Sequence, residues 1–599
     1  MFILEKIIKK FDFIEKLNGI FDRKDKLGFL VVMLAALFMA LFQAIGVASI
    51  LPFINMVMNP NIIFETGWLR YVYSAANFKS TNSFMVFSGC VVLGLLIIGN
   101  LVSAFATWLK INFVWEKNHT LSSALLKKYL SFPYAYFLNR NTNKLGENIL
   151  AEVQQFTNNL LQSVVNIITG SMITVLILML LLYFNPLMTL ISALVLISLY
   201  LGIYFYYAAR LKLEGERRSA GHTEMYKSAS EALSGIKDIK LLGVERFFLQ
   251  RYVKHSKGFS ASQSGYQTIA ILPRYVMEVV AFGGVVSLMI FLIYFNKSTQ
   301  EIIPLVSFFA FAGYRLMPAL QDIFYSVSTY KFSKVALNKI HEALTEDVFE
   351  DNIAKFEHEE NRPMLFEKEI ELRNIDFYYA GNEKIILNNV CLNIAKNTYV
   401  AIIGSTGSGK TTLVDLILGL LTPDKGTLKI DDVEINEKNV KNWQANLGYV
   451  PQQIYLSDDT IVRNIAFGLP DNKINMDQIK KVSKMANLSV FVENELALGY
   501  NTIIGERGIR LSGGQRQRIG IARALYHDPQ VLIFDEATSS LDNATEKEVL
   551  EAIEGIAKLK TMIVIAHRLT TVKNCDRVYV LEKGKIVKSG SYDEIVNKK

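Results

Sequence analysis

Six long apolar runs in the N-terminal half constrain the fold of this chain more than any other feature. The first, Leu27–Met58, contains no charged residue and is long enough to cross a bilayer as a helix. Because a chain inside a bilayer must satisfy its backbone hydrogen bonds internally, these runs predict membrane-spanning helices. The other five runs are Phe84–Leu109, Leu160–Phe184, Leu187–Ala208, Leu272–Phe295 and Ile302–Ala319.

The composition agrees with a membrane protein. At 599 residues the chain is too long for one core and predicts several domains. Apolar residues make up 51% of it and the mean hydropathy is +0.24, which disfavours an entirely soluble enzyme. The net charge of +8 then suggests anionic lipid or basic cytoplasmic loops in preference to nucleic acid. The cysteines, which show no metal or disulfide spacing and so fit a reducing compartment, are Cys90, Cys391 and Cys575.

The placement of lysine and arginine predicts the orientation in the membrane. Both are frequent before Leu27 and over residues 110–159 and 210–271. The positive-inside rule therefore places these segments and both termini in the cytoplasm, as expected for a protein of a bacterial inner membrane. The loops predicted outside carry only Arg70, Lys79 and Lys297.

Residues 1–26 predict an amphipathic elbow helix on the cytoplasmic membrane surface, because apolar residues recur at helical spacing between lysines. A plain soluble helix fits the same spacing. The segment lacks the short apolar core and cleavage site of a signal peptide. The apolar positions are Ile3, Ile7, Ile8, Phe11 and Ile14.

The loops between the spans predict further helices. The two long cytoplasmic loops contain few glycines or prolines and predict helices that project from the membrane, with tips at residues 132–134 and 139–146 and at residues 231–237. These helices are suited to touching a soluble domain, or they are solvated stalks. The outer loop, residues 62–78, predicts a short helix on the outer surface. Its apolar stripe comprises Ile63, Phe64, Trp68, Leu69, Val72 and Tyr73.

Four charged residues lie in or next to the last two spans. Arg315 is near the middle of the sixth, where an arginine costs about 3 kcal/mol on insertion scales, so it must face protein or water. Asp322 lies on about the same helical face, and Arg274 and Glu278 are spaced i, i+4 in the fifth span. These side chains could line a polar cavity that attracts an anion such as a phosphate. Alternatively they form interhelical ion pairs, or Arg274 reaches the inner headgroups.

A phosphate-binding loop begins after an apolar strand, residues 399–403, and leads into a helical run, residues 412–418. This strand, loop and helix order is the context that the Gly-x-x-x-x-Gly-Lys-Ser/Thr pattern requires. Lys410 can reach the outer phosphates of a nucleotide, and the Thr411 hydroxyl can hold Mg²⁺. The predicted ATP-binding residues of this loop are Gly404, Ser405, Thr406, Gly407, Ser408, Gly409, Lys410, Thr411 and Thr412.

The loop belongs to a second domain. Residues 27–335 form the predicted membrane domain, and the acidic stretch within residues 336–364 predicts a linker. Strands and helices alternate over residues 365–599, as in an α/β domain. The predicted fold is therefore an α-helical membrane domain with six transmembrane helices, followed by an α/β P-loop NTPase domain.

Two acids follow a second apolar strand, residues 531–534. An acid at the carboxyl end of a parallel strand beside a phosphate loop can hold Mg²⁺, and Asp535 fits that role. Glu536 is then placed to polarise an attacking water as a general base. The pair predicts ATP hydrolysis with Mg²⁺ as the chemistry of this domain.

The most specific stretch places a serine and two glycines at the start of a helix, which forms a second anion-binding end. It resembles the signature of ATP-binding cassette (ABC) proteins, in which it contacts the ATP of another cassette. The stretch is Leu511, Ser512, Gly513, Gly514 and Gln515.

This resemblance implies roles for other residues. Tyr379 resembles the aromatic residue that stacks on adenine, and Gln452 matches the glutamine that senses Mg²⁺ and the membrane domain. His567 matches the switch histidine that contacts the γ-phosphate, and residues 505–508 resemble an exporter-specific segment. The loop that follows the acidic strand in ABC proteins is matched here by Ser540, Leu541 and Asp542.

The same resemblance implies a dimer. In ABC proteins each ATP lies between the phosphate loop of one cassette and the signature of another, and this chain has one of each. Two identical sites in a homodimer are therefore expected, and six spans followed by one cassette resemble an ABC exporter half-transporter over nearly the whole chain. The implied catalytic residues are Lys410, Gln452, Glu536 and His567, and the implied Mg²⁺ ligands are Thr411, Gln452 and Asp535.

The membrane domain resembles PglK-type flippases of lipid-linked oligosaccharides in residues 235–243 and 272–275, in Arg315 and in the outer helix near Trp68. This implies that the arginines draw a polyprenyl pyrophosphate and its glycan through a cavity, while the outer helix engages the polyprenyl tail. The translocated lipid-linked oligosaccharide would then be used for protein glycosylation or for cell-envelope polysaccharide. ATP binding would open the cavity outward and hydrolysis would reset it.

Three other functions compete with this one. An exporter of drugs, simple lipids or other hydrophobic compounds would favour a cavity without arginines. A peptide exporter is disfavoured because no protease-like domain precedes the first span of this sequence. An ATP-gated channel or a regulator is disfavoured because Glu536 and His567 are both present.

Overall fold

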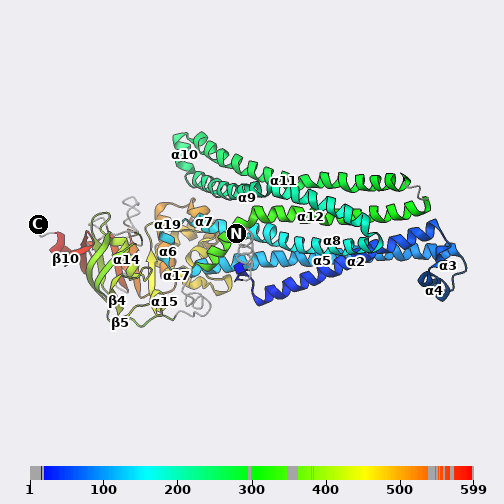
Figure 1. Ribbon diagram of the computed structural model, residues 1–599. Helices are drawn as coiled ribbons and strands as arrows, with labels where there is room; N and C mark the ends of the chain where they lie inside the picture. The colour runs from blue at the N-terminus through cyan, green and yellow to red at the C-terminus, as the bar shows by residue number, and fades with distance from the viewer. Residues whose placement is uncertain are drawn as a thin grey trace. The chain divides into compact units, whose positions relative to one another are not determined.

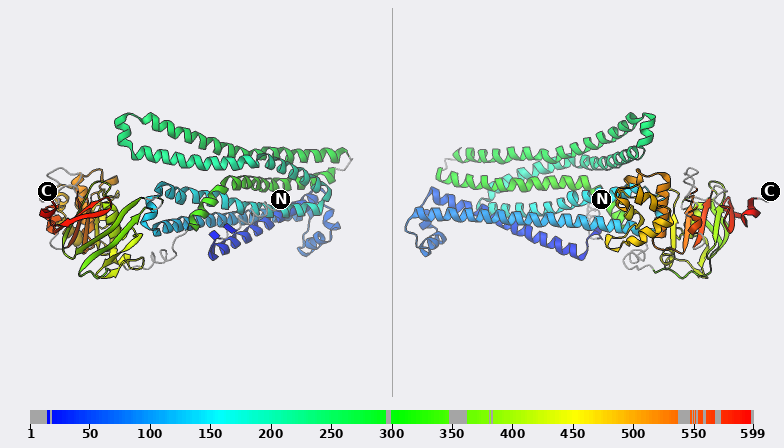
Figure 2. Two further views of the ribbon diagram at one scale, coloured as in Figure 1. Left: turned by 60° about the vertical axis from the view of Figure 1, so that its left-hand side comes forward. Right: turned by 180° about the vertical axis from the view of Figure 1, so that it is seen from behind.

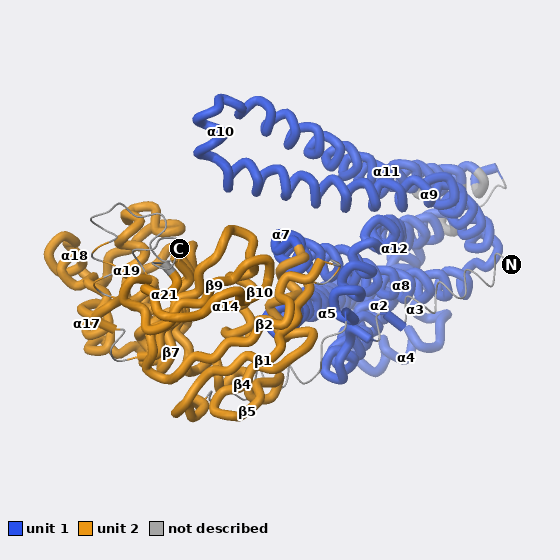
Figure 3. Tube along the Cα trace, turned by 90° about the vertical axis from the view of Figure 1, so that its left-hand side faces the viewer, with its two compact units in different colours: residues 1–132, 141–353 blue, residues 133–140, 354–599 orange. Residues whose placement is uncertain are grey.

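The computed structural model divides the chain into a helical unit and an α/β unit, which Figure 3 shows in two colours. The helical unit comprises residues 1–132 and 141–353, and the α/β unit comprises residues 133–140 and 354–599. The described residues are all except 1–14, 17–18, 295–298, 347–361, 380, 382–383, 537–546, 548, 550, 552, 557–559, 567–571 and 597–599.

Among the described residues, six helices of the helical unit are long and apolar enough to cross a membrane, which confirms the six predicted spans. They run side by side in Figures 1 and 2. The longest, α5, has 51 residues and rises about 75 Å, more than twice the thickness of a hydrocarbon core. The six are α2 (Arg23–Met58), α5 (Thr81–Ser131), α8 (Gln162–Phe184), α9 (Pro186–Ser234), α11 (Glu245–Tyr294) and α12 (Thr299–Thr345).

The tight connection between α8 and α9 follows from two residues. The side chain of Asn185 accepts a hydrogen bond from the backbone N–H of Met188 at 3.3 Å and so caps α9. Pro186 is the first residue of α9, where its fixed φ suits a helix and its missing N–H costs nothing.

The predicted tips of the two long loops contain short helices. In the first loop α6 (Tyr134–Leu138) follows the predicted break at residues 132–134. The helix α7 (Thr142–Glu147) replaces most of the turn predicted over residues 139–146, of which only residues 139–141 are non-helical. The second tip is α10 (Ile236–Leu242), which ends at Gly243 with a φ of 64°. This left-handed conformation favours glycine and lets the chain reverse into α11.

Two buried carboxylates hold together the part of the helical unit near α7. After α7 the helix continues through two wider π-helical turns, η1 (Asn148–Glu152) and η2 (Gln155–Leu161). Glu152 is 1% exposed and lies 2.8 Å from Lys339 Nζ on α12 and 3.7 Å from Arg218 Nη2 on α9. The second carboxylate, Glu147, accepts a hydrogen bond from Thr223 Oγ1 at 2.9 Å. Since buried charges are stable only when paired, these contacts fix α9 and α12 against the π-helical turns.

The outer loop forms two short helices, α3 (Ile62–Glu65) and α4 (Gly67–Ala75), at the end of the helical bundle opposite α10 in Figures 1 and 2. Ile63 and Leu69 are buried against α2 and α5. Of the remaining apolar positions, Phe64, Trp68 and Val72 are exposed, and Tyr73 is half-buried against the same cluster. The helices thus have apolar side chains on both the inner and the outer face.

Most of the elbow helix predicted for residues 1–26 lies outside the described residues, although Lys117 of α5 donates a hydrogen bond to the Ile20 carbonyl at 2.9 Å and pairs with Asp25. The range predicted as a linker, residues 336–364, begins inside α12, which continues to Thr345.

The α/β unit contains two sheets. The antiparallel sheet has the order β2-β1-β4-β5, and the six-stranded sheet has the order β10-β9-β3-β8-β7-β6, in which all neighbours except β10 and β9 pair in parallel. The strands are β1 (Glu369–Tyr378), β2 (Ile385–Ala395), β3 (Tyr399–Ile403), β4 (Lys425–Ile430), β5 (Val433–Glu434), β6 (Leu447–Val450), β7 (Val531–Asp535), β8 (Thr561–Ala566), β9 (Arg577–Glu582) and β10 (Lys585–Gly590).

The helices of this unit cover the parallel sheet and complete two apolar cores, one on each face of it. Every residue of β7 and β8 is buried, as expected for parallel strands covered on both faces. The helices of this unit include α14 (Lys410–Ile417), α16 (Ile461–Ile465), α17 (Met476–Met485) and α19 (Gly513–Leu525).

Replacing Glu152 with alanine should destabilise the helical unit by about 3 kcal/mol, because Lys339 and Arg218 lose their counter-charge. The expected result is a lower unfolding temperature of the detergent-solubilised protein in differential scanning fluorimetry. The matched control is Glu216→Ala, which removes an exposed i, i+4 pair with Lys212 and should cost less than about 0.5 kcal/mol. Equal shifts for both variants would contradict the role given to Glu152.

Candidate functional site

Most of the predicted ATP-binding residues lie at the carboxyl ends of neighbouring strands of the six-stranded sheet. β3, β8, β7 and β6 are parallel neighbours, so their carboxyl ends meet there. The phosphate loop follows β3, the two acids end or follow β7, and Gln452 follows β6. The strand register that aligns these segments pairs Ile403 with Ala566, Asp535 with Ile565 and Val450 with Phe534.

The phosphate loop folds around the amino group of Lys410. Its Nζ donates hydrogen bonds to the carbonyl oxygens of Gly404 at 2.9 Å and Ser405 at 3.0 Å. Gly407 and Gly409 have φ angles of 79° and 103°, which favour glycine. A Cβ on Gly404 would lie 2.2 Å from the carbonyl oxygen of Leu581 in β9. One side of the loop therefore packs directly on the backbone of β9. The loop leads into the N-terminus of α14, as a phosphate-binding loop requires.

Two further groups of this loop suit a nucleotide. Burial lowers the pKa of Lys410, while Glu536 and Asp535 act in the opposite direction. The Ser408 hydroxyl is buried and makes no hydrogen bond to the described residues. Tyr379, the predicted adenine platform, is half-buried, and its hydroxyl lies 2.9 Å from Thr412 Oγ1 on α14. The predicted platform is thus tied to the helix that carries the phosphate loop.

The acidic pair of β7 has two different environments. Asp535 is buried, and its Oδ2 accepts a hydrogen bond from the Tyr449 hydroxyl at 3.4 Å. Glu536 has a φ of 49°, and its Oε2 accepts a hydrogen bond from Gln452 Nε2 at 2.7 Å. The glutamine therefore holds the predicted general base in this structure.

The structure adds Asp415 of α14 to the site, a residue that the sequence did not single out. It is buried, and burial together with the negative charge of Asp535 raises its pKa to about 6. An acid in an otherwise apolar stretch after a phosphate loop was the available signal. Asp415 therefore adds a second buried carboxyl group near Asp535, beyond the predicted set.

Tyr134 in α6, which belongs to the α/β unit, is a second residue that sequence reasoning missed. Burial raises the pKa of its hydroxyl, with smaller contributions from Asp415 and Tyr379. The segment of residues 133–140 therefore contributes a phenol to the surroundings of the nucleotide site.

The predicted signature begins α19. Ser512 Oγ accepts a hydrogen bond from the Gln515 backbone N–H at 3.2 Å, and Gln515 Oε1 accepts one from the Ser512 N–H at 2.8 Å. This reciprocal capping box satisfies two helix-end donors. Leu511 is buried and anchors the turn, whereas Ser512 is exposed. The remaining first-turn N–H groups point away from the helix, where an anion can approach.

Some predicted residues lie outside the described residues and stay predictions. They are His567 and the three residues of the loop after β7, Ser540, Leu541 and Asp542.

The charged residues predicted in or next to the last two spans fall into three groups. Arg274 Nε donates to Glu278 Oε1 at 3.1 Å, so this pair forms within α11 and not between helices. Arg315 is half-buried, and its Nη1 donates to Asn100 Oδ1 on α5 at 3.4 Å. Its guanidinium also lies 5.8 Å from the centre of the Phe311 ring.

Asp322 attracts Lys110, the first charged residue after the second span. Lys110 Nζ donates to Asn166 Oδ1 on α8 at 2.9 Å. In the sequence, Lys110 marks only the start of a predicted cytoplasmic loop. This contact joins residues of different helices. The spacing of residues along a single helix does not predict it.

Comparison with known proteins agrees with this architecture. The model of the ABC transporter transmembrane region matches residues 30–318, and the ABC transporter model matches residues 387–539. The ATP-dependent lipid A-core flippase of Francisella tularensis subsp. holarctica (strain OSU18) is 30% identical over 529 residues, 86% of this chain and 84% of the flippase. This chain belongs to the ABC transporter family. It is a multi-pass exporter-type protein with an ATP-hydrolysing domain fused to its membrane domain.

Other similar proteins cover comparable lengths. The heterocyst differentiation ATP-binding protein HepA of Nostoc sp. is 27% identical over 95% of this chain and 92% of that protein. The alpha-hemolysin translocation ATP-binding protein HlyB of Escherichia coli O157:H7 is 30% identical over 80% of this chain and 66% of its own length. The structure of a bacterial Atm1-family ABC exporter with ATP bound shares the fold with a TM-score of 0.74 over 96% of both chains at 21% identity.

Replacing Asp415 with asparagine should stabilise the α/β unit at pH 7.5. The folded pKa of about 6 exceeds the ordinary value of 3.8, so the folded state binds the proton more tightly. Unfolding free energy therefore falls as the pH rises from about 4 to about 6, and the variant escapes this loss, a gain of up to about 2 kcal/mol.

The measurement is the unfolding temperature of both proteins at pH 7.5 and pH 5.0, where the gain should shrink. Asp432→Asn, at an exposed carboxylate, is the matched control and should be neutral at both values. A gain that is equal at both pH values would contradict the electrostatic explanation.

Proposed function

We propose that this protein is a homodimeric, ATP-driven flippase of the inner membrane. Its substrate would be a lipid-linked oligosaccharide on a polyprenyl pyrophosphate. The observation that carries the proposal is Arg315, a half-buried arginine near the middle of α12. Its contacts among the described residues are uncharged, namely Asn100 and the ring of Phe311. A cation at that depth is expensive unless an anion or water meets it, and a pyrophosphate is such an anion.

The other charged groups of the membrane domain fit the same path. Arg274 is exposed beside Glu278, so its guanidinium keeps donors that an incoming phosphate can use. Asp322 acts as the counter-charge of Lys110, which leaves the group of Arg315, Lys110 and Asp322 with one net positive charge. This net positive charge would attract an anionic headgroup, while Asp322 would still neutralise one of the two cations when no headgroup is bound.

The outer helices supply a surface for the hydrocarbon part of the substrate. Phe64, Trp68 and Val72 are exposed while Ile63 and Leu69 anchor α3 and α4 to the bundle. Exposed apolar side chains on a short amphipathic helix suit the outer leaflet or a polyprenyl chain.

ATP binding and Mg²⁺ would be handled by the residues at the sheet edge. Asp535, Thr411 and Gln452 offer a carboxylate, a hydroxyl and an amide oxygen, which suit the oxygen preference of Mg²⁺. The ion would neutralise charge on the phosphates. Lys410 and the loop N–H groups would hold the phosphates, and Glu536 would accept a proton from the attacking water once Gln452 releases it.

The homodimer and the orientation follow from the same assignments. One chain supplies one phosphate loop and one exposed signature turn at Ser512, so two copies would complete two equal ATP sites. The ATPase domain and both termini would lie in the cytoplasm, where ATP is available and where the basic loops are expected. His567 and Asp542 would complete each site.

Export of a lipid, a drug or another hydrophobic compound is the second candidate. It is favoured by relatives named lipid A-core flippase, one of them 30% identical over 86% of this chain. The two candidates differ in the substrate that stimulates ATP hydrolysis, because only the first requires a pyrophosphate-linked glycan.

Charge removal at Arg315 should weaken the response to glycolipid. In lipid vesicles, an undecaprenyl-pyrophosphate oligosaccharide should stimulate ATP hydrolysis by the unaltered protein, and Glu536→Gln should abolish hydrolysis. Arg315→Gln should raise the half-maximal glycolipid concentration about tenfold, the effect of one lost charge-assisted hydrogen bond. Arg217→Gln, at an exposed arginine of α9 outside the predicted spans, is the matched control and should leave the response unchanged.

An unchanged glycolipid response in Arg315→Gln would remove the assigned substrate site but not the ATPase. Stimulation by hydrophobic drugs or simple lipids, without any response to glycolipid, would establish the second candidate instead.

A further inference from the structure

The residues that follow Gln452 lie directly on the signature helix α19. A Cβ on Gly520 of α19 would lie 2.3 Å from the end of the Ile454 side chain, so Ile454 fills the space that the glycine leaves. Leu456 similarly closes on Gly508, in the segment just before the signature. Glycine at both positions therefore permits a close approach that a larger residue would block.

Arg523, in the last turn of α19, fastens this segment by polar contacts. Its Nη1 donates to the Tyr455 carbonyl at 2.7 Å and its Nε donates to the Asn464 carbonyl at 2.7 Å. The guanidinium carbon also lies 4.7 Å from the centre of the Phe467 ring. One planar cation thus joins α19 to two separate points of the segment that follows Gln452.

The contacts of Arg523 in the described residues are uncharged. Burial lowers its pKa to about 10, which still leaves it cationic at neutral pH. The position of the half-buried guanidinium therefore depends on where the carbonyl oxygens and the ring lie, because no ion pair among the described residues fixes it.

Asn464 of α16 makes the acceptor side rigid. It is fully buried, its Oδ1 accepts from the Ser457 N–H at 3.0 Å and from Arg523 Nη2 at 3.2 Å, and its Nδ2 donates to the Ser457 and Thr460 carbonyls, both at 3.1 Å. The side chain of Thr460 in turn caps α16. The backbone that receives Arg523 is therefore held from within.

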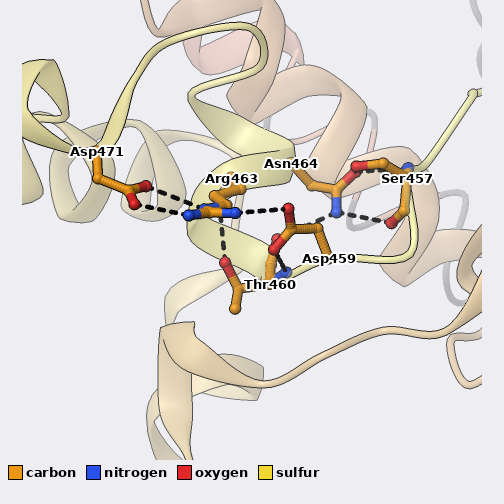
Figure 4. Close-up of polar contacts among 6 residues, drawn as sticks. All are labelled: Ser457, Asp459, Thr460, Arg463, Asn464 and Asp471. Carbon is orange, nitrogen blue, oxygen red and sulfur yellow. Dashed lines mark hydrogen bonds and ion pairs between the residues drawn. The ribbon is translucent and has the colours of Figure 1, made fainter. Parts of the chain in front are cut away.

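An exposed ion-pair group supports this backbone from outside. Figure 4 shows Arg463 between two carboxylates, with Nη2 2.6 Å from Asp471 Oδ2 and Nη1 3.2 Å from Asp459 Oδ2. The three side chains join the beginning of α16 to the turn after it. Together with Asn464 they make residues 457–471 one connected polar structure.

We propose that Arg523 is a positioning residue for ATP hydrolysis, which makes the segment after Gln452 and the signature helix move as one body. Gln452 contacts Glu536 at one end of this connection, and Ser512 begins α19 at the other. A shift of Gln452 when it releases Glu536 is then transmitted to the Ser512 turn. The inference rests on the proposed ATP-site roles of Gln452 and Ser512, but not on the identity of the transported lipid.

The test separates nucleotide binding from turnover in the purified full-length protein in lipid vesicles. Arg523→Gln should lower kcat for ATP hydrolysis about tenfold, the effect of one lost charge-assisted hydrogen bond. The Kd of a fluorescent ATP analogue should change less than about twofold, because Arg523 contacts neither the phosphate loop nor Tyr379. Arg523→Lys keeps the charge without the fork of donors and should fall between the two proteins.

A double-mutant cycle distinguishes positioning from plain destabilisation. If Arg523 acts through Gln452, Arg523→Gln should have little further effect on kcat in a Gln452→Ala background. Multiplicative loss of kcat in that background would overturn the proposal, as would an unchanged kcat in the single variant. Arg577→Gln, at an exposed arginine 5.1 Å from the Tyr579 ring, is the matched control and should leave kcat unchanged.

A second pair of variants applies if Arg523→Gln fails to fold. Gly520→Ala should lower kcat because its methyl group displaces Ile454, and adding Ile454→Ala should restore kcat by making room. A Gly520→Ala variant with normal kcat, or a double variant without recovery, would overturn the proposal. The Kd of the ATP analogue again serves as the readout that should not move.

Discussion

The parallel pairing of β3, β8, β7 and β6 is the interaction on which the ATP site depends. β7 and β8 are buried along their whole length, so apolar packing on both faces of the sheet fixes their positions. Backbone hydrogen bonds then set the register that places Asp535 opposite Ile565. Because the polar residues stand only at the strand ends, a slip of one residue would separate the acids from the phosphate loop. The chemistry at the edge is a consequence of the apolar interior.

A different constraint governs the helical unit, where charge must be neutralised away from water. Outside the predicted spans, Glu152 is surrounded by Lys339 and Arg218 and serves packing. Near the middle of α12, Arg315 meets only neutral described partners, and this difference is why we propose that it serves the substrate and not the fold. Arg274 is intermediate between Glu152 and Arg315: it forms an ion pair with Glu278, but both side chains of this pair remain partly exposed.

The ATPase unit shows how two motifs that are distant in sequence become one mechanical element. Gln452 and Ser512 are both recognised by pattern, yet neither contacts the other among the described residues. The connection runs through Ile454 on Gly520 and through the carbonyl oxygens that receive Arg523. Glycines matter here because they remove side chains where two segments must touch. Arginine matters because its planar donors can hold two carbonyls at once.

The sequence by itself determined the six spans, the order of the domains and the placement of the phosphate loop, because apolar length and glycine spacing are local properties. It also gave the i, i+4 pair of Arg274 and Glu278. Only the tertiary structure placed Asp415 beside Asp535, joined Lys110 to Asn166, and set Arg523 against the segment after Gln452. These contacts join elements far apart along the chain. Burial and partner charge, which decide what such a side chain does, arise only when those elements pack together.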